Sequence, residues 1–273
     1  MDQDPSSFCD FHSHLVPGVD DGAREVEDTL ESVQRMTRLG IRKILTTPHL
    51  NGSLTRDAAA LEERLSEVDE AWDRAAEAVG RDFPEVDFRR GHEVMLDIPD
   101  VDFSDPRMRL AGTRFVLVEW PRLQVPPGTP GVIQRIVAEG YIPIVAHPER
   151  YMGLDRELEI LRQWRDAGAY LQVNYGSFVG RYGADARSFA WRILRRGWAD
   201  YLASDFHGHA QMKIYFKEAW QVLSEAGGEE ALQHLCHVNP GRILRNDAPL
   251  PVPALPSETG LWARMRDLFT GGD

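Results

Sequence analysis

Residues 8–14 read Phe-Cys-Asp-Phe-His-Ser-His, a short apolar run that ends in two histidines. Six further runs along the chain have this form, and most of them also end in a polar or charged residue. Short runs of this kind between polar segments are typical of buried strands. We therefore predict seven strands, at residues 8–12, 43–47, 86–90, 115–120, 142–147, 170–175 and 201–205.

The segments between these strands have the apolar spacing of helices. Residues 61–79 show it most clearly, because apolar side chains recur there at steps of three and four and form one stripe. Similar spacing predicts helices at residues 26–39, 130–139, 158–167, 184–196 and 212–226. A glycine, the usual residue after a helix end, follows each of these five helices, at Gly40, Gly140, Gly168, Gly197 and Gly227.

Strands that alternate with helices pair in parallel and are joined by right-handed crossovers. Seven such units fit a closed or nearly closed barrel better than an open sheet, so we expect an α/β fold of the distorted (β/α)7 barrel type. No linker rich in Pro, Gly or Ser interrupts the alternation, which predicts one domain over residues 1–248. Residues 249–273 form a tail outside it, with the apolar spacing of a short amphipathic helix.

The composition is ordinary for a globular protein, with 42% hydrophobic and 27% charged residues. The two cysteines, Cys9 and Cys236, are too few for a disulfide framework or a four-thiolate zinc site. A formal net charge of −12 disfavours nucleic acid as a partner. No apolar run approaches the roughly 20 residues that span a bilayer, and the polar N-terminus has no signal-peptide core. We therefore expect a cytoplasmic protein without an integral membrane segment.

Side chains that bind metals follow six of the seven predicted strands. They include His12 and His14 after the first strand and further histidines and carboxylates after the others: His49, Glu93, Glu119, His147, Asp205 and His207. A single histidine after a strand is most often a loop or capping residue, but barrel enzymes place their active sites at this end of the strands. Mixed nitrogen and oxygen ligands suit zinc, manganese or iron, and the supply is enough for more than one ion.

In this order, the motifs resemble the polymerase and histidinol phosphatase (PHP) family of metallophosphoesterases. The resemblance is closest to its branch of bacterial protein-tyrosine phosphatases associated with capsule and exopolysaccharide loci. It spans residues 10–207 and rests on seven motifs: His12-Ser-His14 through Asp21-Gly22, Thr47-Pro48-His49, Glu93, Val118-Glu119, Ala146-His147-Pro148-Glu149-Arg150, Gln172-Val173-Asn174 with Gly176-Ser177, and Ser204-Asp205-Phe206-His207.

The resemblance implies three divalent metal ions, with manganese as the first candidate and iron or zinc as the others. It assigns His12, His14, Glu93 and Asp205 to the first ion. The second ion would be held by Glu119, His147 and Glu93, with Glu93 as a bridge. The third would be held by Asp21, His49 and His207. The implied site therefore has nine ligands around one bridging carboxylate.

The resemblance also assigns Arg150 to the substrate phosphate, because its planar fork suits two phosphate oxygens. A surface salt bridge to Glu149 is the alternative. The branch usually has an asparagine after the final histidine and an arginine about five residues later, whereas Gly208 and Met212-Lys213 stand at these places. We expect Lys213 to substitute as a point charge.

The function that these features predict is the metal-dependent hydrolysis of phosphotyrosine by a metal-activated water. A phenolate leaving group, with a pKa of about 10, needs less help from a general acid than an alkyl alcohol does. The resemblance suggests a tyrosine-phosphorylated protein as partner, namely the C-terminal tail of a bacterial tyrosine autokinase. It leaves the oligomeric state open. Two alternatives remain: a phosphatase for a small phosphomonoester such as histidinol phosphate or a nucleotide, and a metal-stabilised binding module without turnover.

Thiol chemistry is a further alternative, because Cys236 and Arg242 have the Cys-x5-Arg spacing of cysteine-based tyrosine phosphatases. That mechanism requires a strand, a loop of amides around the phosphate and a helix that begins near the arginine. Here a helical pattern at residues 229–235 precedes the cysteine, and Pro240 removes one amide from the loop. The sequence therefore disfavours a thiol mechanism.

Overall fold

The computed structural model describes residues 7–255, and all strand pairs in this part of the chain are parallel. The strands are β1 (Phe8–Asp10), β2 (Ile41–Thr46), β3 (His49–Asn51), β4 (Asp87–Arg90), β5 (Glu93–Met95), β6 (Phe115–Glu119), β7 (Ile142–Ala146), β8 (Tyr170–Asn174) and β9 (Tyr201–Ala203). All seven predicted strands are present. The two additional ones, β3 and β5, are short continuations of β2 and β4.

Two sheets result, in the orders β1-β2-β4 and β3-β5-β6-β7-β8-β9. The break between β2 and β3 falls at Thr47 and Pro48, because proline has no N–H to donate to a ladder. Gly91 and His92 separate β4 from β5. The sequence prediction ended both strands at these breaks, since proline and glycine are typical of loops.

The first and the last strand meet at their carboxyl ends. A parallel bridge joins Ser13 and Phe206, where His14 N–H donates to the Phe206 carbonyl at 2.8 Å and Asp205 N–H to the His12 carbonyl at 2.9 Å. One bridge rather than a full ladder connects these edges. The prediction of an α/β fold with parallel strands is confirmed, and the interrupted strands give it the expected distortion.

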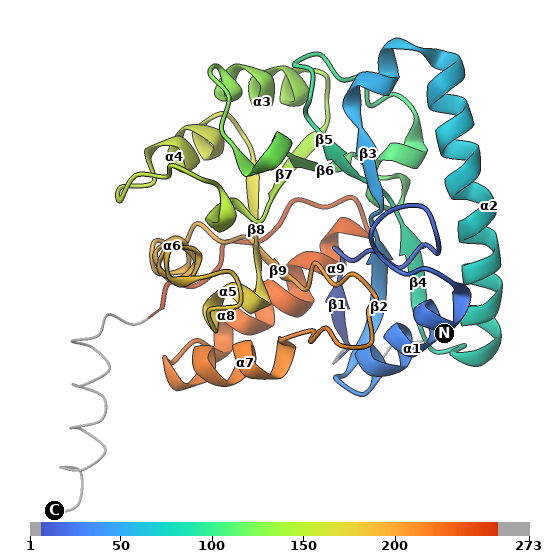
Figure 1. Ribbon diagram of the computed structural model, residues 1–273. Coiled ribbons are helices and arrows are strands. Elements are labelled where there is room, and N and C mark those ends of the chain that lie inside the picture. Colours follow the sequence, from blue (N-terminus) through green and yellow to red (C-terminus); the bar gives the residue numbers. More distant parts are fainter. Residues whose placement is uncertain (1–6, 256–273) are drawn as a thin grey trace, which may run out of the picture.

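Helices lie around the outside of the strands (Figure 1). They are α1 (Val26–Thr37), α2 (Ala58–Asp82), α3 (Thr129–Ala138), α4 (Glu159–Asp166), α5 (Tyr175–Phe178), α6 (Ala184–Arg195), α7 (Phe216–Glu225), α8 (Glu229–Gln233) and α9 (Asn239–Ile243). Short 3-10 turns occupy Gly52–Arg56, Pro106–Met108, Leu110–Gly112, Pro121–Leu123 and Pro148–Arg150, and a π-helical turn spans His234–Val238. The five glycines predicted to end helices all have positive φ, from 65° to 103°.

One helix begins later than predicted. The pattern over residues 212–226 placed its start at Met212, but α7 begins at Phe216, after Tyr215 with a φ of 60°. Arg35 of α1 donates hydrogen bonds to the carbonyls of His209 and Met212. The Met212 carbonyl thus bonds to a side chain rather than within a helix, and the residues from Met212 to Tyr215 remain a loop.

The core has two layers because side chains alternate across the strands. In β6, Phe115 and Leu117 belong to an inner cluster with Ile144 of β7, whereas Val116 and Val118 pack in the larger outer cluster under the helices. These four side chains of β6 are fully buried. Strands buried on both faces explain the continuous apolar runs that predicted them.

Residues 249–255 of the predicted tail pack on this core. The Asn239 side chain bonds to the backbone of Leu250 through both its oxygen and its nitrogen, at 2.8 and 2.9 Å. Leu255 is buried beside Gly228. The expected amphipathic helix falls on residues that lie outside the described range. Among the helices of residues 7–255, none has the length and apolar character needed to cross a membrane.

A buried carboxylate between β8 and β9 predicts a pH effect on stability. Asp200 accepts hydrogen bonds from Arg165 at 2.6 Å and from the Leu171 amide at 2.9 Å. Burial raises the pKa of Asp200 to about 6, although Arg165 favours its charged form. The folded chain therefore holds this proton more tightly than the unfolded chain, and the free energy of unfolding falls as the pH rises from about 4 to about 6.

Asp200→Asn is expected to remove this component, which is roughly 3 kcal/mol at most because one pKa unit corresponds to about 1.4 kcal/mol. The measurement is urea unfolding at several pH values in the presence of a chelator, with the exposed Asp73→Asn as control. If the free energies of unfolding of the wild type and of Asp200→Asn differ by the same amount at every pH from 4 to 7, the prediction is wrong.

Candidate metal centre

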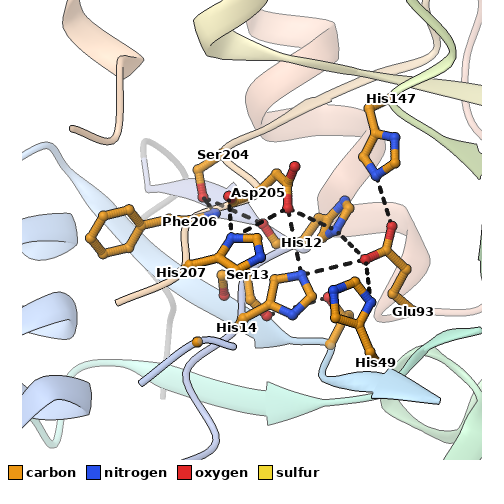
Figure 2. Close-up of polar contacts among 12 residues, drawn as sticks. His12, Ser13, His14, His49, Glu93, His147, Ser204, Asp205, Phe206 and His207 are labelled. Atoms are coloured by element: carbon orange, nitrogen blue, oxygen red, sulfur yellow. Dashed lines mark hydrogen bonds and ion pairs between the residues drawn. The ribbon is translucent and has the colours of Figure 1, made fainter. Parts of the chain in front are cut away.

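The strand ends bring eight of the nine predicted ligands into one buried or half-buried cluster. Figure 2 labels all of these except Glu119. Adjacent parallel strands end at the same side of a sheet, so residues far apart in the sequence meet there. His12 and His14 follow β1, His49 begins β3, Glu93 begins β5 and Glu119 ends β6, while His147 follows β7, and Asp205 and His207 follow β9. The ninth, Asp21, lies at the rim with its side chain 71% exposed.

Glu93 is the centre of the cluster and is fully buried. Its Oε2 lies 3.2 Å from His12 Nε2, 3.4 Å from His14 Nε2 and 3.2 Å from His49 Nδ1. Its Oε1 lies 2.9 Å from His147 Nε2. The two oxygens of one carboxylate thus face different histidines, which is the geometry that a bridging ligand requires.

Three overlapping groups in the described chain place one ligand atom of each residue within 4.8 Å of the others. The first contains His12, His14, Glu93 and Asp205, which is the set expected for the first ion. The second adds His14 to the expected Asp21, His49 and His207. The third joins His49 to Glu93 and Glu119.

His147 is absent from the third group, where the resemblance placed it. Its Nε2 lies 2.9 Å from Glu93 but 3.9 Å from Glu119 Oε2. It therefore lies closer to Glu93 than to Glu119.

The unpaired atoms of the cluster test whether a metal fits. His12 Nε2, His14 Nε2, His49 Nδ1 and Glu93 Oε2 are buried, and none of them has a hydrogen-bond partner among the described residues. Buried polar atoms are seldom left unpaired, because their desolvation is costly. Lone pairs of imidazoles and a carboxylate that face one another are a donor set for divalent ions such as zinc, manganese or iron.

The other ring nitrogens of three histidines are held by hydrogen bonds. His12 Nδ1 lies 2.9 Å from Gln172 Oε1, His14 Nδ1 lies 2.8 Å from Asp20 Oδ2, and His207 Nδ1 lies 3.0 Å from the Asp205 carbonyl. An Nδ1–H that donates to an oxygen leaves the Nε2 lone pair directed at the cluster, as in many metal sites. The sequence prediction did not assign these supporting roles to Asp20 and Gln172, although both lie within or beside the matched motifs.

Without a metal, the histidines and carboxylates of the cluster shift one another's pKa values. Burial opposes ionisation of Glu93, but the neighbouring His12, His14 and His147 outweigh it and hold the pKa of Glu93 well below its usual range. Burial and the Glu93 charge raise the pKa of Glu119 to about 8. Burial likewise opposes protonation of His12, but Glu93 and Asp205 raise its pKa to about 9. Metal ions would therefore displace protons from this site.

Two of the clustered residues have a strained backbone. His147 has a φ of 34° and Asp205 a φ of 50°, in the left-handed region that favours glycine. Such strain costs roughly 1–3 kcal/mol per residue and is concentrated at functional sites. The two turns direct the side chains of these residues into the cluster directly after β7 and β9.

Arg150 lies at the edge of the cluster, with its side chain 22% exposed. Its Nη1 donates to Asp205 Oδ2 at 2.5 Å. The alternative salt bridge to Glu149 is wrong, since Glu149 is buried and accepts hydrogen bonds from Ser177 Oγ at 2.6 Å and the Asn174 amide at 3.0 Å. Arg150 is thus free to present its other nitrogens to a ligand.

Lys213 does not join the cluster. Its side chain is 68% exposed and belongs to the loop that precedes α7. Its Nζ lies 3.6 Å from Oε1 of Glu218, a residue of α7. The expectation that Lys213 acts beside Arg150 has no support in this geometry, because the loop held by Arg35 turns it toward α7.

A family model described as capsular polysaccharide synthesis, CpsB/CapC, matches residues 8–245. The chain belongs to the CpsB/CapC family. The tyrosine-protein phosphatase YwqE of Bacillus subtilis is 28% identical over 252 residues, which cover 91% of this chain and 96% of YwqE. The tyrosine-protein phosphatase CpsB of Streptococcus agalactiae serotype V is 24% identical over 250 residues, or 88% of this chain and 99% of CpsB.

The structural comparison agrees with this family. One similar crystal structure belongs to a set for YwqE from Bacillus subtilis and CpsB from Streptococcus pneumoniae, which are described as metal-dependent tyrosine phosphatases. Its TM-score is 0.74, at 28% sequence identity. It covers 92% of this chain and 99% of the solved one. The prediction of a capsule-associated, PHP-like tyrosine phosphatase family is confirmed.

The geometry around Cys236 also disfavours thiol chemistry in this CpsB/CapC protein. Cys236 is fully buried within the π-helical turn His234–Val238, and burial raises the pKa of its thiol to about 12. A helical backbone there offers no open loop of amides to a phosphate. Arg242 instead donates to the carbonyl of Ala248 at 2.5 Å.

Asp20 offers a test of how the cluster is supported. Asp20→Ala is expected to weaken metal affinity by about 10–100-fold, because the carboxylate that orients His14 is lost. Titration of the metal-free protein with manganese, followed by calorimetry, measures this change. The matched control is Asp73→Ala, an exposed aspartate of α2; equal affinities in the two variants would show that Asp20 does not support the site.

Proposed function

We propose that this chain is a metal-dependent phosphatase that hydrolyses phosphotyrosine in proteins. The observation that carries the proposal is the buried group of unpaired imidazole and carboxylate atoms around Glu93, with Arg150 at its edge. The names of the relatives YwqE and CpsB support the choice of phosphotyrosine.

The residues of the site have separate tasks in this proposal. One ion would be held by His12, His14, Glu93 and Asp205. A second would be held by Glu93, Glu119 and His147, and a third by Asp21, His49 and His207. Divalent ions bound there supply a hydroxide at neutral pH and polarise the phosphoryl oxygens. Manganese is our first candidate, with iron or zinc as the others, since these metals accept mixed nitrogen and oxygen ligands.

Arg150 would bind the phosphate of the substrate. Its Nη1 is engaged by Asp205, and no described residue accepts a hydrogen bond from its Nη2. A guanidinium held in this way offers its remaining donors to phosphoryl oxygens and offsets their growing charge. The phenolate of tyrosine, with a pKa of about 10, leaves without strong general-acid help.

The partner and the compartment follow from the same proposal. We propose a tyrosine-phosphorylated protein as substrate, with the C-terminal tail of a bacterial tyrosine autokinase as the specific candidate, and a cytoplasmic location. The net charge of −12 supports a protein rather than a nucleic acid as partner.

The experiment is a substrate screen on the manganese-supplemented protein with elemental analysis of the same sample. It compares a phosphotyrosine peptide, histidinol phosphate and nucleotides. Highest kcat/KM for the phosphotyrosine peptide supports the proposal. Preference for a small phosphomonoester would contradict the substrate class, and full metal content without any turnover would indicate a binding module.

Arg150 and Lys213 form a matched pair for the phosphate-binding role. Arg150→Ala is expected to lower kcat/KM for the phosphotyrosine peptide by about a hundredfold or more, because it removes a preorganised cation from the developing charge. Lys213→Ala removes an exposed cation outside the cluster and is expected to leave kcat/KM unchanged. A comparable loss of kcat/KM in both variants would indicate that Lys213 also binds the phosphate.

A further inference from the structure

Arg150 has a second neighbour that the sequence motifs do not include. Its Cζ lies 4.3 Å from the centroid of the Tyr182 ring, so the guanidinium stacks on the face of that ring. Tyr182 belongs to the turn between α5 and α6 and is half-buried. Among the described residues only Asp205 accepts a hydrogen bond from this guanidinium, and one such bond leaves the group free to rotate. An aromatic face fixes its plane.

We propose that Tyr182 is a positioning residue for substrate binding: its ring holds the guanidinium of Arg150 in the plane that presents the free nitrogens to the phosphate. The inference rests on the proposed function, because it concerns the phosphate-binding role of Arg150. It adds a residue about 30 positions away from the arginine that it orients.

Tyr182 is itself held on two sides. A Cβ at position 176 would meet Tyr182 Cε2 at 3.3 Å and Arg181 Cβ at 3.0 Å, so the absence of a side chain at Gly176 leaves room for the ring. The Tyr182 hydroxyl lies 3.4 Å from Asn174 Nδ2. The hydroxyl contact is long, so this hydrogen bond by itself contributes little to the position of Tyr182.

The same asparagine ties this arrangement to the metal centre. Asn174 Nδ2 donates to Asp205 Oδ2 at 2.9 Å, the oxygen that also accepts from Arg150. The other oxygen, Oδ1, lies 3.5 Å from both His12 Nε2 and His14 Nε2. Asp205 thus faces the candidate metal ligands with one oxygen and the phosphate-binding arginine with the other. Tyr182 contacts both Arg150 and Asn174, and both of these residues donate a hydrogen bond to Asp205.

The test separates a positioning role from general packing. Tyr182→Leu is expected to raise KM for the phosphotyrosine peptide and the Kd of inorganic phosphate about tenfold, within the range of a cation–π contact, with kcat changed less than about threefold. Tyr182→Phe keeps the ring and is expected to stay within about twofold of the wild type. The matched control is Tyr141→Leu, which removes a tyrosine stacked under Arg109 at 5.8 Å, at the end of β7 opposite to His147.

A double-mutant cycle makes the test decisive. In the Arg150→Ala background, Tyr182→Leu is expected to have no further effect on phosphate affinity, measured by calorimetry on the manganese-loaded protein. An unchanged phosphate Kd in Tyr182→Leu, an equal loss in Tyr182→Phe, or an additive loss in the Arg150→Ala background would each overturn the proposal. Phosphate binding does not require turnover, so a wild type that binds phosphate without hydrolysing phosphotyrosine would refute the proposed function and leave Tyr182 testable.

Discussion

Replacing Glu93 with glutamine is expected to lower kcat/KM for a phosphotyrosine peptide by at least about a thousandfold. Glu93 faces His12, His14 and His49 with one oxygen and His147 with the other. An amide cannot bridge two cations with two equivalent oxygens, and it lacks the charge that offsets theirs. A catalytic metal contributes several kcal/mol, and about 1.4 kcal/mol corresponds to a tenfold change in rate.

The measurement pairs steady-state kinetics with the metal content of each purified variant. Asp200→Asn is the matched control, because it also replaces a buried carboxylate by an amide but lies outside the cluster. We expect fewer bound ions and lost turnover in Glu93→Gln only. Full activity in Glu93→Gln, or an equal loss in Asp200→Asn, would rule out a central role for Glu93.

Removal of divalent ions by a chelator is expected to abolish phosphotyrosine hydrolysis, and added manganese is expected to restore it. The same loss is expected in Cys236→Ser treated with chelator, whereas untreated Cys236→Ser should retain near wild-type kcat/KM. The physical reason is that the candidate ligands converge at the strand ends, while Cys236 is buried in a helical turn with its pKa raised to about 12.

Cys9→Ser is the control for this experiment, because Cys9 is also a buried free cysteine. Hydrolysis that persists in chelator and disappears only in Cys236→Ser would reverse the mechanism in favour of the thiol. Thermal unfolding of each variant separates a catalytic loss from a loss of the folded protein.

Much of the fold could be predicted because it depends on local patterns. Strands buried on both faces appear as continuous apolar runs, and the glycines after five helices adopt the positive φ that their position predicted. The short strands β3 and β5 escaped prediction, since Pro48 and Gly91 have the appearance of loop residues. The late start of α7 escaped it as well, because Arg35 of another helix binds the Met212 carbonyl.

By itself, the sequence determined which residue types follow which strands, and parallel pairing then required the histidines and carboxylates of several strands to meet at one end. Only the tertiary structure decided how they are shared: Glu93 at the centre, Asp20 and Gln172 behind His14 and His12, and Arg150 on Asp205 and Tyr182 rather than on Glu149. The spacing of ligands along a strand is a local property of the chain. The partners of a side chain are set by contacts between segments far apart in the sequence, 160 residues in the case of His12 and Gln172, and no local pattern encodes them.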